Sequence, residues 1–283
     1  MFVNKASTLY SNPMLIIDGR KTREELLPGL IEKIKKLPKA PTLAIIQVGN
    51  RPDSTSFIKA KKAFAKKIGV YEKHIQLPET ISQKELLKTI AACNNDDEIT
   101  GIIVQLPLPE GLDRDLAIDA ILPRKDADGL TPTNTKSGAV IPATARGIRE
   151  LLNHYKIGLA RKKVTVIGRS MLVGKPIAAM CEREGAIVTV CHRQTLDLAK
   201  ETKAADIIIC AVGKQGLITA KHVKAGQVVI DVGINRNEEE RLVGDVDFEA
   251  VKDIVSAISP VPGGVGPMTV LGLFENLVDL CHN

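Results

Sequence analysis

Six short segments rich in Val and Ile recur along the chain, and stretches with helical character separate most of them. They lack the alternation of polar and apolar residues that marks a half-exposed strand. Strands buried on both faces have this uninterrupted apolar character, and strands that alternate with helices form parallel sheets. The pattern therefore predicts an α/β protein whose parallel sheets are covered on both faces. The predicted strands are residues 43–48, 101–105, 164–168, 187–191, 207–211 and 228–232.

A stretch rich in Gly, Pro and Thr at residues 129–142 divides the chain before a helix predicted at 146–155 and a fresh strand at 164. The 283 residues are also enough for two domains of ordinary size. We therefore expect a domain boundary at 141–145. A second break, SPVPGGVGP at residues 259–267, is too rich in Pro and Gly for regular structure and precedes a last apolar helix.

The charge balance raises the question of a polyanionic partner, since 39 Lys and Arg against 33 Asp and Glu give a net charge of +6. The chain has no Trp, three Tyr and five Phe, so it offers few rings for stacking bases. We therefore expect no nucleic-acid partner. Five Cys without a Cys-x-x-Cys pair suggest reduced thiols in the cytoplasm. Residues 1–12 lack an apolar signal region, and the apolar runs are too short to span a membrane.

A glycine-bearing turn follows the predicted strand at 164–167 and runs from Gly168 to Gly174 into a helix. Such a turn lets the backbone approach a phosphate, although this spacing is equally compatible with an ordinary tight turn. The next strand ends in His192, Arg193 and Gln194, where an NAD-binding chain commonly has a carboxylate for the ribose hydroxyl. With Arg169 as a second cation, the pattern favours NADP over NAD. The alternative is that Arg193 is an ordinary surface cation.

One lysine of the predicted helix after residue 52 lies on its apolar face. At about 100° per residue, Lys61 falls within the stripe formed by Phe57, Phe64 and Ile68, whereas Lys59, Lys62 and Lys66 point away. Burial lowers the pKa of a lysine and can make it a general acid and base near neutral pH. The alternative is that the ammonium reaches water along an apolar stem. Gln105 at the end of a strand and Asp128 in a loop are candidate partners, and no metal ligand set is expected.

Five motifs in order resemble the bifunctional methylenetetrahydrofolate dehydrogenase/methenyltetrahydrofolate cyclohydrolase family. They are QLPLP at 105–109, KDADG at 125–129, GRSMLVGKP at 168–176, DVGIN at 231–235 and PVPGGVGPMT at 260–269. The resemblance implies that NADP+ oxidises 5,10-methylenetetrahydrofolate to the 5,10-methenyl cation, which water then opens to 10-formyltetrahydrofolate. It also implies a homodimer formed through the cofactor domains and a place in one-carbon metabolism and purine biosynthesis.

The resemblance also implies a role for each matching residue. Lys61 aligns with the acid/base lysine of the hydrolytic step, Gln105 with the glutamine that tunes it, and Asp128 with the acid that binds the pterin. Gly168, Arg169, Ser170 and Ile234 align with cofactor contacts, and Arg193 is expected to bind the 2′-phosphate. Further residues are expected along the folate cleft: Phe57, Pro262, Gly263, Gly264 and Val265.

The implied fold has two α/β domains around a cleft. Residues 1–145, completed by a C-terminal helix at 268–283, would form the folate domain, and residues 146–267 a Rossmann-type NADP domain. Three departures from the family bear on function. Phe57 stands where the family has a tyrosine, so a hydroxyl is lost, and Arg193 replaces a serine. PATARG at 142–147 replaces the family's PCTPxG, which we interpret as a change in packing and loop rigidity.

Two other functions remain compatible with the sequence. One is a mainly monofunctional NADP-dependent dehydrogenase, because Phe57 lacks the hydroxyl that the hydrolytic step would use. The other is a basic RNA- or anion-binding protein that has kept the fold without catalysis. The scarcity of aromatic residues argues against the second, and the presence of Lys61, Gln105 and Asp128 argues against it more strongly.

Overall fold

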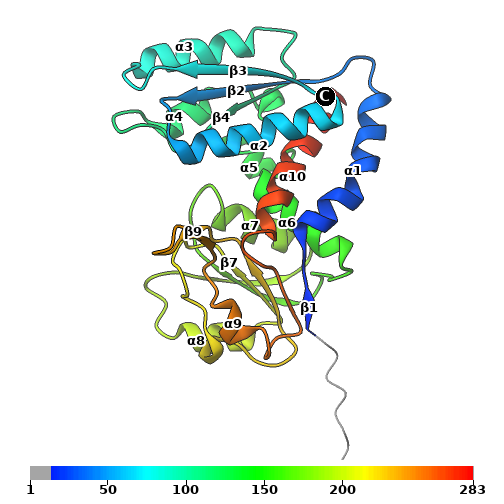
Figure 1. The fold of residues 1–283 in the computed structure, drawn as a ribbon, viewed down its shortest axis with the longest axis vertical. Helices are drawn as coiled ribbons and strands as arrows, with labels where there is room; N and C mark the ends of the chain where they lie inside the picture. The colour runs from blue at the N-terminus through cyan, green and yellow to red at the C-terminus, as the bar shows by residue number, and fades with distance from the viewer. Residues whose placement is uncertain (1–13, 283) are drawn as a thin grey trace, which may run out of the picture.

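A computed structural model describes residues 14–282 of the chain. Two α/β units lie one above the other in Figure 1, joined by long helices that run between them. The predicted α/β class with parallel sheets is confirmed. Residues 1–12, on which the expectation of no secretion signal rests, lie outside the described residues. Within the described residues, no helix has the length and apolar character needed to cross a membrane.

The first unit is built on a parallel three-stranded sheet in the order β3-β2-β4. Leu43 and Ile45 of β2 pack toward α2, whereas Ala44 and Ile46 pack toward α3, so the central strand is buried on both faces as predicted. The edge strand β3 was not predicted, because its sequence YEKHIQL is polar and partly exposed. The elements are β2 (Thr42–Val48), β3 (Tyr71–Leu77), β4 (Gly101–Val104), α1 (Gly19–Lys35), α2 (Pro52–Ile68), α3 (Gln83–Asn94) and α4 (Arg114–Asp119).

The second unit is built on a six-stranded sheet in the order β1-β11-β8-β7-β5-β6, with all neighbouring strands parallel. A short antiparallel pair, β9 and β10, lies beside it. The strands are β1 (Leu15–Ile16), β5 (Lys163–Ile167), β6 (Ile187–Cys191), β7 (Ile207–Cys210), β8 (Val228–Asp231), β9 (Asn235–Arg236), β10 (Leu242–Val243) and β11 (Ala257–Ile258). The helices are α7 (Gly174–Arg183), α8 (Leu198–Ala204) and α9 (Phe248–Val251).

Two features of this sheet differ from the sequence expectations. The first described strand, β1, pairs with β11 and so belongs to the second unit, although residues 1–145 were all expected in the first. At the opposite edge, β6 is not buried on both faces, since Ile187 is 60% exposed and Val190 is 40% exposed. A continuous apolar run cannot distinguish a central strand from an edge strand, because both contain the same β-branched residues.

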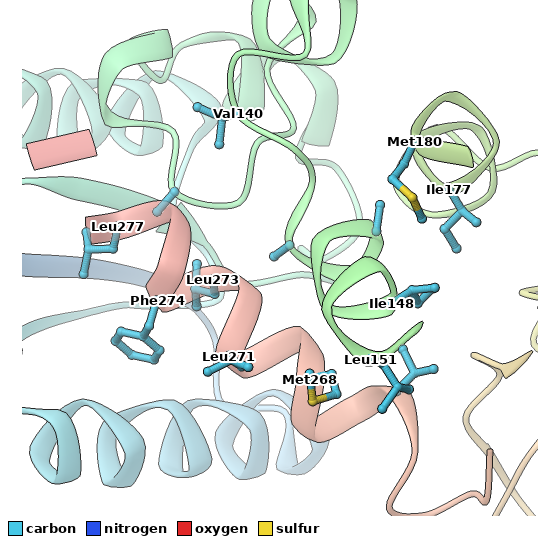
Figure 2. Packing of buried hydrophobic residues seen from close by; sticks show 14 of the residues in the cluster. Val140, Ile148, Leu151, Ile177, Met180, Met268, Leu271, Leu273, Phe274 and Leu277 are labelled. Carbon is cyan, nitrogen blue, oxygen red and sulfur yellow. The ribbon is translucent and has the colours of Figure 1, made fainter. Parts of the chain in front are cut away.

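The helices α6 (Ala143–His154) and α10 (Val265–Asp279) pack closely against each other between the two sheets. Glycine makes this approach possible: a Cβ on Gly147 would lie 2.4 Å from the Met268 carbonyl oxygen. Figure 2 shows Phe274 and Leu277 of α10 on the side of the first unit. The Phe274 ring lies 5.3 Å from that of Phe64 on α2. The last helix begins at Val265, inside the stretch expected to be irregular.

Candidate active site

Lys61 lies on α2, whose buried face carries Ile58, Phe64 and Ile68. Its ammonium donates a hydrogen bond of 3.0 Å to Oε1 of Gln105, which directly follows β4 and is buried. The Gln105 amide in turn donates to the Leu106 carbonyl oxygen at 2.8 Å, and this bond fixes which end of the amide faces the lysine. The carboxyl end of β4 and one face of α2 thus bring the two side chains together.

The other lysines of α2 only partly follow the expected pattern. Lys59 and Lys66 are exposed, as predicted for residues that point away from the core. Lys62 is half-buried and pairs with Glu72 of the unpredicted strand β3 at 3.1 Å. Phe57 does not join the buried stripe, because the residue is 47% exposed and lines a cavity instead.

Asp128 is presented by a loop that a neighbouring carboxylate organises. The buried Asp126 accepts hydrogen bonds from the backbone amides of Gly129 and Thr131 and from the side-chain amide of Asn134, which lies on α5 (Pro132–Ser137). The carbonyl oxygen of Asp128 accepts a bond from the amide of Ala143, at the start of α6. The loop is therefore tied at both ends, which holds the backbone that carries Asp128 in place, and its side chain lines the same cavity as Lys61.

Burial shifts the pKa values of Lys61 and Asp128 in opposite directions. Loss of solvent lowers the pKa of the Lys61 ammonium, and the negative charge of Asp128 only partly opposes this. Burial likewise raises the pKa of Asp128, with Lys61 opposing the shift and Asp126 adding to it. Both shifts bring the pKa values of the two groups closer to neutral pH. A lysine in this setting can both accept and donate a proton during turnover.

The three side chains Lys61, Gln105 and Asp128 line a cavity of about 170 Å³. Its wall includes Leu172 and Val173 from the second unit, so the cavity lies where the two units meet. Ala143 also lines it, at the position of the family cysteine. The departure from PCTPxG therefore alters the wall of this cavity as well as the packing that we expected it to affect.

A second cavity, of about 570 Å³, gathers the other residues expected around the folate and the nicotinamide. Phe57 forms part of its wall, one helical turn before Lys61. Arg20 at the start of α1 lines the same cavity, and its backbone amide donates to the Gly263 carbonyl oxygen at 3.0 Å. Further predicted residues in the wall are Ile234, Pro262, Gly263, Gly264 and Val265.

The glycine turn after β5 is held in close backbone contact on two sides. A Cβ on Gly168 would lie 2.3 Å from the carbonyl oxygen of Ala211, and one on Gly174 would lie 2.3 Å from that of Gly168. The spacing of the two glycines therefore belongs to a turn whose first and last residues are in backbone contact. The Ser170 hydroxyl accepts from the amides of Val173 and Gly174 and so holds the turn that leads into α7.

The two predicted phosphate-binding cations project from neighbouring strands of the second sheet. Arg169 follows β5 and Arg193 follows β6, and both side chains are exposed. The Arg169 guanidinium donates to Oε1 of Gln194 at 3.5 Å, so the two loops lie side by side. A dianionic phosphate needs positive charge and free donors, and this edge of the sheet offers both.

Several residues that shape the site were missed by the sequence analysis. Asp126 and Asn134 organise the Asp128 loop, and Asp231 and Asp245 brace the loops of the second unit. Asp126, Asn134 and Asp245 resemble ordinary polar turn residues in the sequence, and Asp231 the end of a predicted strand, because their burial depends on segments distant in sequence. The DADG spacing was the one signal available for Asp126, since a short acidic side chain commonly bonds to backbone amides a few residues ahead.

The fold and the site together define a two-domain α/β enzyme class, with a dinucleotide-binding sheet on one side of a cleft and a lysine of lowered pKa on the other. Residues 17–128 match the catalytic-domain model of the tetrahydrofolate dehydrogenase/cyclohydrolase family, and residues 142–283 match its NAD(P)-binding domain. The chain belongs to this family, and the resemblance found in the sequence is confirmed.

Individual relatives agree with this assignment over nearly the whole chain. A bifunctional protein FolD from Nautilia profundicola is 44% identical over 95% of this chain and 98% of its own length. A FolD crystal structure from Campylobacter jejuni has a TM-score of 0.92 at 41% identity, covering 95% of this chain and 99% of that one. The Trypanosoma brucei FolD structure, complexed with NADP cofactor and an inhibitor, has a TM-score of 0.90 at 33% identity, covering 96% and 98%.

Proposed function

We propose that this protein oxidises 5,10-methylenetetrahydrofolate with NADP+ and hydrolyses the resulting 5,10-methenyl cation to 10-formyltetrahydrofolate. The observation that carries the proposal is the cavity between the two units, in which Lys61, Gln105 and Asp128 converge. The matches to both domains of the family support both activities. The same matches argue against a basic RNA- or anion-binding protein without catalysis.

The residues present fit a phosphorylated dinucleotide. The backbone at Gly168 is packed too closely for any side chain, and Arg169 and Arg193 supply positive charge at the ends of neighbouring strands. When bound, NADP+ supplies the hydride acceptor. The chain positions the folate carbon that loses the hydride, through the cavity wall formed by Phe57, Ile234 and the 262–265 loop.

The hydrolytic step needs proton transfers that Lys61 can perform. As water attacks the methenyl carbon, the neutral amine accepts a proton from that water. The ammonium then returns that proton to N5 of the folate while the bond between N5 and the carbon breaks. The remaining hydroxyl proton leaves to solvent as the formyl C=O bond forms, so that one proton is released overall. The Gln105 oxygen keeps the amine directed into the cavity, and Asp128 binds the adjacent N–H groups of the pterin.

The tyrosine hydroxyl of the family is missing from this site, because Phe57 occupies the position on the same face of α2. The phenyl ring can still pack against an aromatic ring of the folate. Since hydride transfer depends chiefly on positioning, the loss should affect hydrolysis more than oxidation. This residue is the specific observation that favours the second candidate, a mainly monofunctional dehydrogenase.

We further propose a cytoplasmic homodimer that feeds purine biosynthesis. The free and buried Cys93, Cys181, Cys191 and Cys210 support a reducing compartment. The exposed apolar edge at β6, with Ile187 and Val190, supports a second subunit on the cofactor domain, because an open apolar strand edge favours pairing. Substitution of Ile187 by Lys should convert a dimer to a monomer in sedimentation velocity, and an unchanged dimer would contradict this interface.

The decisive experiment follows methenyl absorbance and NADPH formation separately in the purified protein, with NADP+ and NAD+ supplied in turn. Bifunctional activity predicts NADPH formation from methylenetetrahydrofolate and, without any dinucleotide, loss of methenyl absorbance above the uncatalysed rate. NADPH formation with uncatalysed hydrolysis would establish the monofunctional alternative. Absence of both reactions would refute the proposed function.

A further inference from the structure

Asp245 lies just after β10, and its side chain is completely buried. Its carboxylate accepts hydrogen bonds from three successive backbone amides in the loop after β7: Val212 at 2.7 Å, Gly213 at 3.1 Å and Lys214 at 2.7 Å. Gly213 has a φ of +71°, which helps turn the three N–H groups toward one point. The loop therefore forms an anion nest that is filled by a side chain of the same chain.

A fourth donor connects this carboxylate to the larger cavity. The side-chain amide of Asn235 donates to Asp245 at 3.0 Å, and Asn235 lines the cavity beside Ile234. One buried carboxylate thus joins the loop after β7 to the wall where the nicotinamide contact is expected. Within residues 14–282, the side-chain amide of Asn235 donates to no other acceptor.

The loop held by Asp245 borders the dinucleotide turn. The strands β5 and β7 are neighbours in the sheet, and Ala211, at the start of the loop, is the residue whose carbonyl oxygen Gly168 approaches. In open parallel sheets the ligand binds at the carboxyl ends of such strands. The position of the loop therefore sets the space available to a dinucleotide above Gly168.

Two glycines leave room for a reciprocal arrangement of carboxylates. A Cβ on Gly233 would lie 2.1 Å from the Asp245 carboxylate, and one on Gly244 would lie 1.8 Å from that of Asp231. Asp231 accepts from the backbone amides of Gly233, Asp245 and Val246. The segments 231–235 and 244–246 are thereby locked together, which leaves the Asp245 side chain one orientation.

We propose that Asp245 is a positioning residue for the dinucleotide, acting through the 212–214 loop and Asn235. The inference rests on the proposed function, because it takes NADP+ as the ligand above Gly168. Asp245 has no role in the cavity of Lys61, where methenyltetrahydrofolate is hydrolysed without a dinucleotide. Its loss should therefore separate the two activities of a single chain.

The test replaces Asp245 by Asn in the full-length protein. The substitution keeps the size of the side chain. It replaces one accepting oxygen by an NH2 group, which cannot accept from the four donors around it. Loss of one hydrogen bond to a charged group predicts a rise of about tenfold or more in the KM and the Kd for NADP+. Hydrolysis of methenyltetrahydrofolate without a dinucleotide should stay within about twofold of wild type.

Asp247→Asn is the matched control, since this nearby carboxylate caps α9 through the amide of Ala250 and is exposed. Asn235→Ala provides a second variant that keeps the filled nest and removes only the fourth donor, and a smaller rise in the KM for NADP+ is expected. The proposal is overturned if NADP+ binding is unchanged in both variants, or if hydrolysis falls as far as oxidation in a folded Asp245→Asn protein. Failure of the wild type to reduce NADP+ would instead refute the proposed function.

Discussion

Replacement of Lys61 by Met is the sharpest test of the acid/base assignment. Methionine keeps most of the length and apolar stem of lysine and removes the amine that donates to Gln105 at 3.0 Å. General acid/base catalysis contributes roughly 10²- to 10⁴-fold to a rate. At about 1.4 kcal/mol for each factor of ten, the hydrolytic barrier should rise by about 3 to 5 kcal/mol.

The effect on folding should be smaller than the effect on hydrolysis. The substitution leaves the buried Gln105 oxygen without its donor, at a cost of about 1–3 kcal/mol. It also removes an amine whose burial is unfavourable enough to lower its pKa, which offsets part of that cost. The variant should therefore remain folded, and any large loss of hydrolysis will reflect lost chemistry.

The assay follows methenyltetrahydrofolate absorbance without dinucleotide, and then NADPH formation from methylenetetrahydrofolate. In Lys61→Met the methenyl compound should accumulate as the end product of oxidation. Lys59→Met is the control, because Lys59 is exposed on the same helix and should leave both rates unchanged. Hydrolysis within tenfold of wild type in a folded Lys61→Met protein would refute the assigned role.

Three further predictions concern other parts of the site. Phe57→Tyr should raise the rate of hydrolysis more than the rate of oxidation. Equal changes in the two rates would contradict the inference that the missing hydroxyl affects mainly hydrolysis. Arg193→Ser should raise the KM for NADP+ about tenfold and leave that for NAD+ unchanged, because a charged contact to the 2′-phosphate is lost. Burial raises the pKa of Asp231 from 3.8 to about 7, so the folded state binds the extra proton between those values. The loss of this proton from Asp231 should lower the free energy of unfolding by roughly 4 kcal/mol as the pH rises from 3.8 to about 7. Denaturant unfolding at pH 5 and pH 8 should show a weaker pH dependence in Asp231→Asn than in wild type.

The sequence was most informative where a local pattern decides the structure. Buried strands such as β2 and β7 could be predicted because Val and Ile dominate them and helices flank them. The edge strand β3 could not, since its polar residues contact solvent on one side. The two residues of β1 could not be placed either, because their partner β11 lies more than 240 positions away.

The site was predictable to the extent that its residues belong to contiguous motifs. Helix geometry alone singled out Lys61 as a charge within an apolar stripe, but it left open whether the ammonium is buried or reaches water. Gln105 could be named as a candidate partner from its place at the end of a predicted strand, but its direct hydrogen bond to Lys61 could not, since α2 and the end of β4 are separated by two further elements. The orientation of Phe57 depended on where the second unit packs, and helix periodicity carries no information about that.

Asp245 illustrates a kind of functional residue that a single sequence conceals. The segment GDVD reads as a polar turn, and only the arrangement in space shows that Gly244 clears room for Asp231 while Gly233 clears room for Asp245. The two segments lie about a dozen residues apart and share no period. Each glycine leaves space for the carboxylate of the other segment. Neither glycine–carboxylate pair can therefore be recognised before the positions of both loops are known. The residues that hold a cofactor loop in position can therefore be more deeply buried, and less apparent in sequence, than those expected to touch the cofactor.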